Sequence, residues 1–527
     1  MGKRRIVSFV ALGVTAALFA AACGDSDEPG EQASVDEDVL AGVQAGLGDS
    51  STTTGAAAER PGTIEEWREL WAAERAAVVQ RIEENGWGLQ ADGQTILGPE
   101  GFTVDLSTCP ANWSATEGLT DTAITYGLPI ALSGASAETG NIGRGLGAIL
   151  EAFAEDGAFT DSLGATRSVN FLLKDDMYDP ARAIPLVDEL LDSEHAFAIT
   201  TSGSPQTLKT YDKLNDRCVP HLFNPTGHAA WGDPVNHPWT TGMFLPYSTE
   251  TILWGSFIEE RLDEFEDGTI TVAALVLDND AGEFWDSNFQ AYIEQSDLLR
   301  DRVEYVTERV GQQDPTINVP MTNLAAADPD FFFNMVNGSL CAQSVTEAAE
   351  NGMREQTPYL FEVSVCGKIQ NAVSEEVVGD ASDGWWVMGG GTIDFNSPSF
   401  DGEPWVEWAR AELEERGLDW QSSVSFSTGV TMAWNMAQLL QIAGELEGGL
   451  TRANLITAAR ATEMTNPNYL PGIRWSMDGN ADPYWIEGSD VSQWSAEEQM
   501  WLQQGDVIEL SGETPLCAWD AASSVCR

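Results

Sequence analysis

Residues 196–223 read AFAITTSGSPQTLKTYDKLNDRCVPHLF and contain one complete strand–turn–helix–strand unit. The apolar run 196–200 predicts a buried strand, the apolar spacing of 206–215 predicts a helix, and 219–223 predicts the next strand. Ser202, Gly203 and Ser204 form the turn between the first strand and the helix. Strands joined in this way lie parallel in one sheet, so the stretch predicts an α/β fold.

The same alternation continues on both sides of this stretch. Before it, strands are predicted at 123–128 and 167–174 and helices at 143–155 and 180–191. After it, a second series predicts helices at 250–264, 285–294 and 340–351 and strands at 269–277, 302–305, 330–335 and 359–361. Two series in a chain of 527 residues predict two α/β lobes, each with a parallel sheet.

The first residues predict export. Lys3, Arg4 and Arg5 precede an uncharged, largely apolar run that ends in small residues before Cys23. The run is short for a membrane span, and it resembles the bacterial lipoprotein signal. We therefore expect a signal peptide over 1–22, a lipid on Cys23 and a flexible polar tether over 23–62.

Beyond the tether, 63–120 is predicted as an N-terminal extension. Its first part, 63–84, has apolar residues at helical spacing, with Thr63 and Glu66 placed as a capping box and Asn85-Gly86 as the stop. The extension and the C-terminal tail 511–527 are expected to pack on the first lobe and to leave the space between the lobes free.

Six cysteines follow Cys23, and an even number in an exported chain predicts disulfides. Many pairings are open. The favoured ones are Cys341–Cys366 and the short C-terminal loop Cys517–Cys526, which leaves Cys109 with Cys218. None of the cysteines has CxxC spacing, so zinc is not expected.

The formal net charge of −57 comes from 83 acidic and 26 basic residues. A chain of this charge repels nucleic acid and anionic lipid, and dispersed acids are typical of a solvated, salt-adapted surface. The sequence contains neither a G-x-S-x-G elbow nor a G-x-x-x-x-G-K-[ST] loop. We expect no enzyme activity, no cofactor and no metal site.

Five short motifs then appear in an order that resembles a known family, the leucine/isoleucine/valine-binding-protein-like receptors, or type I periplasmic binding proteins. The similarity extends over about residues 121–485. The motifs are Leu128-Pro129-Ile130-Ala131-Leu132-Ser133-Gly134 with Thr139-Gly140, Asp175-Asp176-Met177-Tyr178-Asp179-Pro180, Thr201-Ser202-Gly203-Ser204, Phe223-Asn224-Pro225-Thr226, and Gly472-Ile473-Arg474-Trp475-Ser476 with Asp478-Gly479-Asn480-Ala481-Asp482.

The resemblance implies two Rossmann-like lobes joined by a three-strand hinge, with a ligand held between them. It assigns lobe 1 to 121–246 and 380–465, and lobe 2 to 247–379 and 466–510. Closure of the lobes on the ligand is the motion expected of such a fold.

In lobe 1, the resemblance places the ligand against turns that follow strands, where open α/β sheets bind ligands. Ser202, Thr226 and His228 match positions that hold the carboxylate and ammonium ends of an amino acid, and Thr139 matches one that contacts the ligand side chain. The same turns contain Ser133, Gly203 and Ser204. His228 departs from the usual hydroxyl residue, which indicates either a ligand with a further acidic group, a ligand other than a simple α-amino acid, or a plain surface histidine.

Lobe 2 is expected to contribute residues from three turns. These are Ala281, Glu283 and Phe284 after the strand at 272–277, Asn337 after 331–335, and Glu362. A carboxylate such as Glu283 or Glu362 would hold a ligand ammonium by a charge-assisted bond.

The family resemblance implies a solute-binding lipoprotein of an ABC importer, anchored to the outer face of the cytoplasmic membrane. Its partners would be a small amino-acid-like solute and the permease and ATPase subunits, and the chain itself is expected to be a monomer. Two alternatives stay open: a ligand-sensing domain that works with a signalling partner, and a surface lipoprotein without a transport role.

Overall fold

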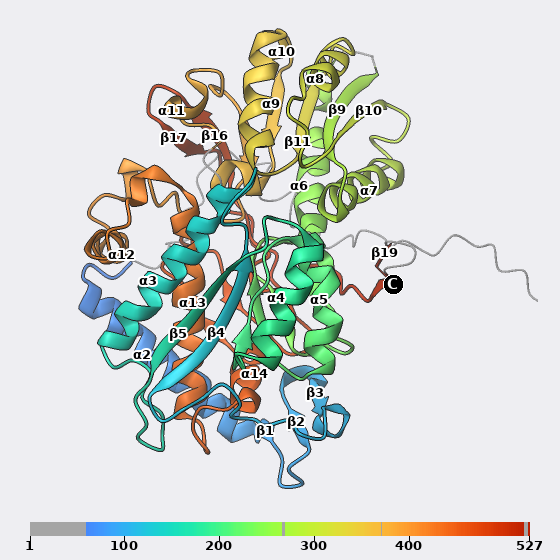
Figure 1. The fold of residues 1–527 in the computed structure, drawn as a ribbon. Coiled ribbons are helices and arrows are strands. Elements are labelled where there is room, and N and C mark those ends of the chain that lie inside the picture. The colour runs from blue at the N-terminus through green and yellow to red at the C-terminus, as the bar shows by residue number, and fades with distance from the viewer. Residues whose placement is uncertain (1–59, 266–268, 370–371, 521–524, 527) are drawn as a thin grey trace, which may run out of the picture. The chain divides into compact units, whose positions relative to one another are not determined.

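The computed structural model of the protein describes residues 60–265, 269–369, 372–520 and 525–526 (Figure 1). The predicted signal peptide, the lipidation site at Cys23 and nearly all of the tether lie outside these residues. Among the described helices, none is long and apolar enough to cross a membrane.

The N-terminal extension begins with helix α2 (Ile64–Asn85), which confirms the helix predicted from the sequence. The Thr63 hydroxyl accepts a hydrogen bond from the Glu66 N–H, and Gly86 ends the helix with φ 64°, a left-handed conformation that glycine adopts without strain. A small antiparallel sheet follows, made of β1 (Gly88–Leu89), β2 (Thr95–Leu97) and β3 (Thr103–Asp105).

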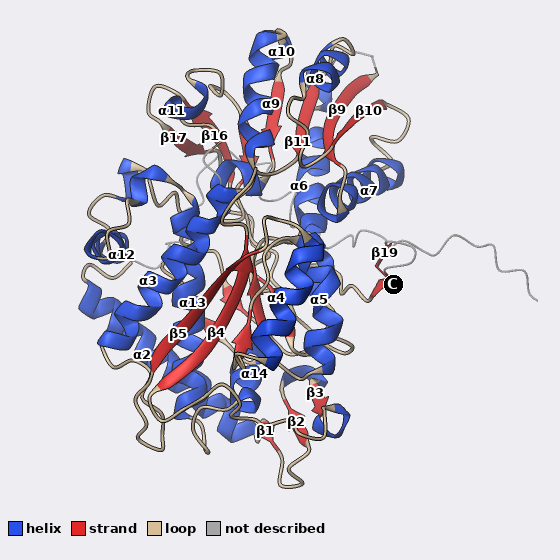
Figure 2. Cartoon of the chain, viewed as in Figure 1, coloured by secondary structure: helices blue, strands red, loops and turns tan. Residues whose placement is uncertain are grey.

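Lobe 1 contains a parallel sheet in the order β5-β4-β6. Apolar residues fill its centre, and helices lie on both sides of β4 and β5 (Figures 1 and 2). Two shorter parallel strands, β7 (His221–Asn224) and β8 (Thr240–Gly242), follow. The strands of the three-stranded sheet are β4 (Ala123–Ile130), β5 (Ser168–Asp175) and β6 (Ala198–Ile199). The helices are α3 (Gly140–Glu155), α4 (Pro180–Asp192) and α5 (Ser204–Asp216).

Lobe 2 contains a seven-stranded sheet in the order β10-β9-β11-β12-β13-β16-β17. The strands up to β13 are parallel, and the last two are antiparallel. The strands are β9 (Ile270–Leu277), β10 (Val303–Val310), β11 (Phe331–Met335), β12 (Tyr359–Glu362), β13 (Trp386–Met388), β16 (Val491–Ser495) and β17 (Met500–Gln503). The helices beside them are α6 (Tyr247–Glu260), α7 (Asp280–Gln295), α8 (Asn318–Ala325) and α9 (Ser339–Glu350).

Between β13 and β16 the chain returns to lobe 1. It forms α12 (Pro404–Glu415), α13 (Ser425–Glu445), α14 (Arg452–Arg460), β14 (Glu463–Met464) and β15 (Trp475–Ser476). Helix α13 packs along α3, and almost every one of its residues is buried. The chain therefore passes between the lobes three times, after β8, after β13 and after β15.

Three disulfides join Cys109 to Cys218, Cys341 to Cys366 and Cys517 to Cys526, and all three predicted pairings are confirmed. The first connects the extension to lobe 1, and the second lies inside lobe 2. The third closes the C-terminal tail on itself.

Candidate functional site

The candidate site lies where the carboxyl ends of the lobe 1 strands meet lobe 2. Gly203 is at its centre, with φ 87° at the start of α5. A Cβ atom on Gly203 would lie 2.8 Å from the Gln206 Oε1 atom and 2.8 Å from the Tyr178 ring. Glycine therefore lets both side chains approach the turn closely.

Tyr178 connects this turn to the other lobe. Its hydroxyl accepts a hydrogen bond of 2.9 Å from the amide nitrogen of Asn337, in the turn after β11. Close by, the Gln206 side chain is fully buried, and neither of its polar atoms has a hydrogen-bond partner among the described residues. The Oδ1 atom of Asn337 also lacks a partner there.

Three hydroxyl side chains form the next part of the site, which we call the hydroxyl cluster: Ser204, Thr226 and Tyr247. The Ser204 and Thr226 oxygens are 2.6 Å apart, and both side chains act to lower the pKa of the Tyr247 hydroxyl. Burial raises the pKa of Tyr247 to about 12, so the phenol stays protonated at neutral pH and can donate a hydrogen bond.

Lobe 2 faces this cluster with an aromatic ring backed by a carboxyl. The Trp285 ring centre lies 3.9 Å from that of Tyr247, and its Nε1 donates to Glu250 at 2.9 Å. The other Glu250 oxygen accepts from the Ser364 N–H at 2.7 Å. Burial raises the pKa of Glu250 to about 7, which these hydrogen bonds only partly oppose.

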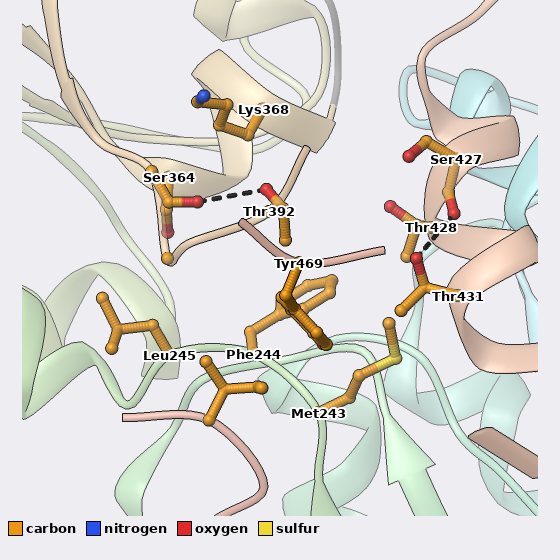
Figure 3. A pocket seen from close by; sticks show the side chains of 13 residues that line it. Met243, Phe244, Leu245, Ser364, Lys368, Thr392, Ser427, Thr428, Thr431 and Tyr469 are labelled. Atoms are coloured by element: carbon orange, nitrogen blue, oxygen red, sulfur yellow. Dashed lines mark hydrogen bonds between the residues drawn. The ribbon is translucent and has the colours of Figure 1, made fainter. Parts of the chain in front are cut away.

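A small cavity lies among the segments where the chain passes between the lobes (Figure 3). Its volume is about 30 Å³, which is room for one or two waters. Thr431 donates to the Ser427 carbonyl at 3.0 Å on one wall, and Lys368 pairs with Asp490 at 3.2 Å on another. The lining residues are Met243, Phe244, Leu245, Ser364, Lys368, Gly389, Gly390, Thr392, Ser427, Thr428, Thr431, Tyr469 and Ile486.

The lobes thus contact each other directly around the site. Besides the Tyr178–Asn337 bond, Gln312 of lobe 2 donates to the Ser136 hydroxyl of lobe 1 at 3.4 Å. A solute larger than a few atoms enters only if the lobes separate. Polar groups and aromatic rings from both lobes thus line the site, and such groups can bind a small molecule by hydrogen bonds and ring contacts.

Most of the predicted residues lie at this interface. Ser202, Gly203, Ser204 and Thr226 lie together with Asn337, and Ala281 is buried at the start of α7. The predicted ligand contacts themselves stay predictions.

His228 and Phe284 contact each other across the lobes, with ring centres 4.3 Å apart. The His228 Nδ1 atom accepts a hydrogen bond from the Ala230 N–H, and burial lowers the pKa of this imidazole to about 3. His228 is therefore a neutral, buried ring.

Two predicted hydroxyls make hydrogen bonds that hold the loop after β4. Ser133 donates to the Asp175 carboxylate at 2.6 Å, and Thr139 donates to the Ser136 carbonyl at 2.7 Å. Asp175 also accepts from the Leu132 N–H at 2.8 Å, so these contacts fix the loop after β4.

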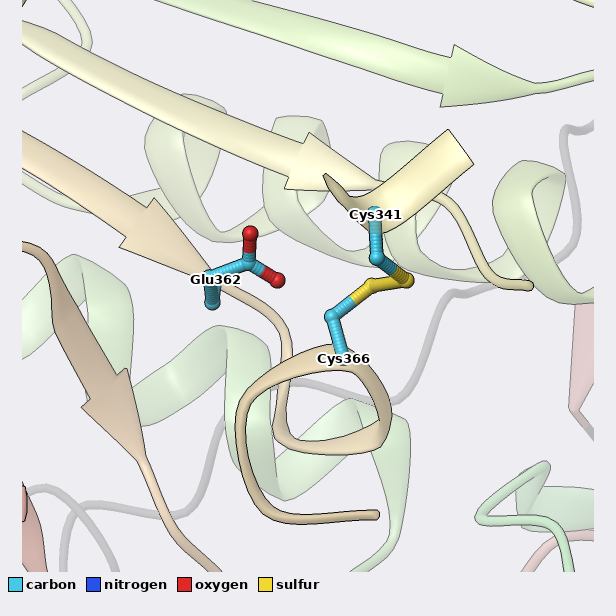
Figure 4. Close-up of side chains that lie close together, drawn as sticks. All are labelled: Cys341, Glu362 and Cys366. Carbon is cyan, nitrogen blue, oxygen red and sulfur yellow. A yellow bond between two sulfur atoms is a disulfide. The ribbon is translucent and has the colours of Figure 1, made fainter. Parts of the chain in front are cut away.

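The two predicted lobe 2 carboxylates lie elsewhere. Glu283 points toward Arg309 at 3.6 Å, with 51% of its side chain exposed. Glu362 is fully buried beside the Cys341–Cys366 disulfide (Figure 4), and its oxygens lack a hydrogen bond within the described part of the chain. Burial raises the pKa of Glu362 to about 8, which the neighbouring Asn334 only partly opposes.

Sequence reasoning missed Tyr178, Gln206, Tyr247 and Glu250. Tyr178 stands inside the Asp175–Pro180 motif, and Gln206 is the third residue of α5, so both were within reach of the motif argument. Tyr247 and Glu250 begin α6, and only the crossing of the chain between lobes brings them to the site.

The comparisons with known proteins agree with this architecture. The family described as "Periplasmic binding protein" matches residues 123–486. Among curated proteins, none matches the sequence.

Several solved structures share the fold at low sequence identity. A branched-chain amino acid ABC transporter protein from Thermus thermophilus with bound valine has a TM-score of 0.58 and 14% identity, over 74% of this chain and 97% of that one. A fatty acid ABC transporter substrate-binding protein from Thermomonospora curvata has a TM-score of 0.58 and 16% identity, over 75% and 95%. A solute-binding protein from R. palustris in complex with 4-hydroxybenzoate has a TM-score of 0.58 and 16% identity, over 73% and 97%.

The matched family covers lobe 1 and the strands of lobe 2 from β9 to β13, and the solved structures have the same α/β architecture. The chain belongs to the periplasmic binding protein family.

Proposed function

We propose that this protein is the extracytoplasmic solute-binding component of an ABC importer, held at the outer face of the cytoplasmic membrane by a lipid on Cys23. It captures one small solute between its lobes and delivers it to permease and ATPase partners as a monomer, without catalysis. The solute bears a carboxylate and a compact apolar part.

The observation that carries this proposal is the set of buried, unpartnered polar atoms where the lobes meet. Leaving such groups without hydrogen bonds in a protein interior is costly, and a ligand that bonds to them removes that cost. The Gln206 amide and the Asn337 Oδ1 atom lie on opposite lobes, on either side of Tyr178. A solute that touches both would favour the closed state.

The chemistry of the lobe 1 wall favours a carboxylate. Helix α5 begins at the turn 202–204, and the unpaired N–H groups of a helix start favour anions. The hydroxyl cluster adds donors next to these N–H groups. The solved relatives described above carry valine or 4-hydroxybenzoate, or are named for fatty acids, and each of these solutes is a carboxylate.

Trp285 and the cavity lining support a compact apolar part in the same solute. The Trp285 ring and the side chains of Met243, Leu245 and Ile486 supply apolar surface beside the polar groups. Pockets that combine a few placed polar groups with an apolar wall are typical small-molecule sites.

The test is thermal unfolding of the purified protein with valine, 4-hydroxybenzoate, decanoate and, as a solute without a carboxylate, glucose. A bound solute at about one hundred times its Kd adds about 2.7 kcal/mol to the free energy of unfolding. We expect a raised midpoint with one carboxylate class, reduced or lost in Gln206→Leu and in Thr226→Val.

The control is Gln80→Leu, the same chemical change on the exposed face of α2. It should keep the full ligand response. No shift with any carboxylate, or equal shifts in the wild type and in both site variants, would contradict the proposal.

A further inference from the structure

The C-terminal tail is attached to the body at both lobes. Glu487 accepts hydrogen bonds from the Gly512 N–H and from the Thr514 N–H. The Thr514 hydroxyl lies 2.9 Å from that of Thr249 in α6, and the Cys517 N–H donates to the Gly232 carbonyl at 3.1 Å. These bonds bring the tail to the interface between the lobes, so the expectation that it leaves this space free is wrong.

The tail places Trp519 against one ring from each lobe. Its ring centre lies 4.5 Å from that of His228 in lobe 1, at an interplanar angle of 88°. It lies 5.7 Å from that of Phe284 in lobe 2, at 65°. Both arrangements are the edge-to-face geometry that aromatic pairs favour. Three rings from three separate segments therefore meet at one end of the site.

This end of the site adjoins the hydroxyl cluster. The His228 N–H donates to the Thr226 hydroxyl at 3.4 Å, so one residue separates Trp519 from the cluster. Trp519 is held in a two-stranded hairpin, β18 (Trp519–Asp520) with β19 (Val525–Cys526), which the Cys517–Cys526 disulfide closes.

We propose that Trp519 is a clasp and a specificity-determining residue. It stabilises the closed lobes by bridging His228 and Phe284, and it forms the end wall that limits the length of the solute. The tail lies outside residues 123–486, so the clasp is an addition to the matched fold. The limit on solute length rests on the proposed function; the bridging of the lobes does not.

The first test measures the distance between the lobes without any solute. Spin labels are attached through Leu163→Cys in lobe 1 and Val319→Cys in lobe 2, whose native side chains are 73% and 68% exposed. Distance distributions are compared for the wild-type tail, Trp519→Ala and Trp519→Phe. We expect Trp519→Ala to raise the ratio of open to closed molecules about threefold to tenfold, and Trp519→Phe to raise it less.

The matched control is Leu516→Ala, three residues earlier in the tail, where the side chain is 46% exposed. It should leave the distribution unchanged. A Trp519→Ala distribution equal to the wild type, in protein whose circular dichroism shows it is folded, would overturn the clasp.

The second test asks which solutes enter. Calorimetric titrations with valine, 4-hydroxybenzoate and decanoate compare the wild type with Trp519→Ala, and we expect only the variant to bind decanoate. If the distances respond to Trp519 but no carboxylate binds either protein, the proposed function fails and the clasp stands. If carboxylates bind and neither distances nor chain-length preference respond, the clasp fails and the function stands.

Discussion

Glu362 shows how burial favours the protonated form of a carboxyl group. Both oxygens are enclosed at the end of β12 beside the Cys341–Cys366 disulfide. An ionised carboxylate is poorly stabilised there, so the protonated form persists up to a pKa of about 8 in the folded chain. In the unfolded chain the same group has its ordinary value of 4.5.

This difference predicts a pH dependence of stability. Between pH 4.5 and 8 the folded protein holds a proton that the unfolded chain releases, so the free energy of unfolding falls as pH rises, by at most about 1.4 kcal/mol per pH unit for this group. Glu362→Gln removes the ionisation and should gain stability over the wild type progressively across that window. Thermal midpoints measured at steps of pH check it.

Glu362→Asp is the matched control, because it keeps an ionisable group in nearly the same place and should keep the slope. Parallel curves for the wild type and Glu362→Gln from pH 4.5 to 8 would show that this carboxyl does not titrate as described.

Replacing Gly203 gives a second prediction about a single residue. A Cβ atom would approach Tyr178 and Gln206 to less than 3 Å, and φ at Gly203 is positive. Gly203→Ala therefore adds both a steric clash and backbone strain. We expect a loss of about 1–3 kcal/mol in the free energy of unfolding and a weaker response to the carboxylate that binds the wild type. Chemical denaturation and titration measure the two effects.

Gly157→Ala separates backbone strain from crowding. Gly157 has φ 73°, but no neighbouring atom lies within 4 Å of the position that a Cβ atom would take, so its replacement adds strain alone. It should cost about 1 kcal/mol and leave solute binding intact. Equal effects of the two variants on binding would remove Gly203 from the site.

Contacts between tryptophan side chains hold helix α2 against lobe 1. Trp71 stacks with Trp67 in the same helix and meets Trp405 and Trp434 edge to face, at ring-centre distances of 5.5, 5.5 and 5.6 Å. Isolated helices are marginal in water, so this packing, more than helix propensity, holds the extension on lobe 1.

Trp71→Ala should therefore lower the free energy of unfolding by about 3–5 kcal/mol, whereas Glu69→Ala, on the exposed face of α2, should change it by less than about 0.5 kcal/mol. Urea denaturation measures both. A loss below about 1 kcal/mol for Trp71→Ala would mean that the extension contributes little to the folded body.

Elements with a clear local pattern could be predicted from the sequence, and others could not. The apolar run of β9 and the β–α spacing from 123 to 224 predicted strands and helices within a few residues of those observed. Helix α13 was missed because it is buried on nearly all sides, so it has no polar face to reveal a helical period.

The residues of the candidate site also divide into those that could be predicted from the sequence and those that could not. Ser202–Ser204 and Thr226 follow strands and could be placed by topology. Tyr247, Glu250 and Trp519 reach the interface through a lobe crossing and a tail, contacts that no local pattern encodes. Glu283 and Glu362 were chosen for charge at strand ends, but the neighbouring Arg309 and the depth of burial decide where these carboxylates lie.

The large excess of acidic side chains opposes folding of the protein. With 83 acidic and 26 basic residues, the folded body brings like charges together that the unfolded chain keeps apart. Salt shortens the range of this repulsion from about 10 Å at 0.1 M to about 3 Å at 1 M. We expect the thermal midpoint to rise as NaCl increases from about 0.05 M to about 1 M.

Choline chloride is the companion measurement, since it screens charge but its cation coordinates carboxylates poorly. Equal stabilisation by both salts indicates screening. A midpoint that stays flat or falls in NaCl would show that repulsion between acids is not a main term in the stability of this protein.

The hydrogen bond between Tyr178 and Asn337 stabilises the closed arrangement of the lobes without a ligand, and this opposes the entry of a solute. Under the proposed function, a solute enters only after this contact opens, so its apparent Kd equals the intrinsic value divided by the fraction of molecules that stand open. If about 1% are open, capture weakens about a hundredfold. Under the proposed function, every further bond that holds the empty lobes together lowers the apparent affinity for the solute by the same rule.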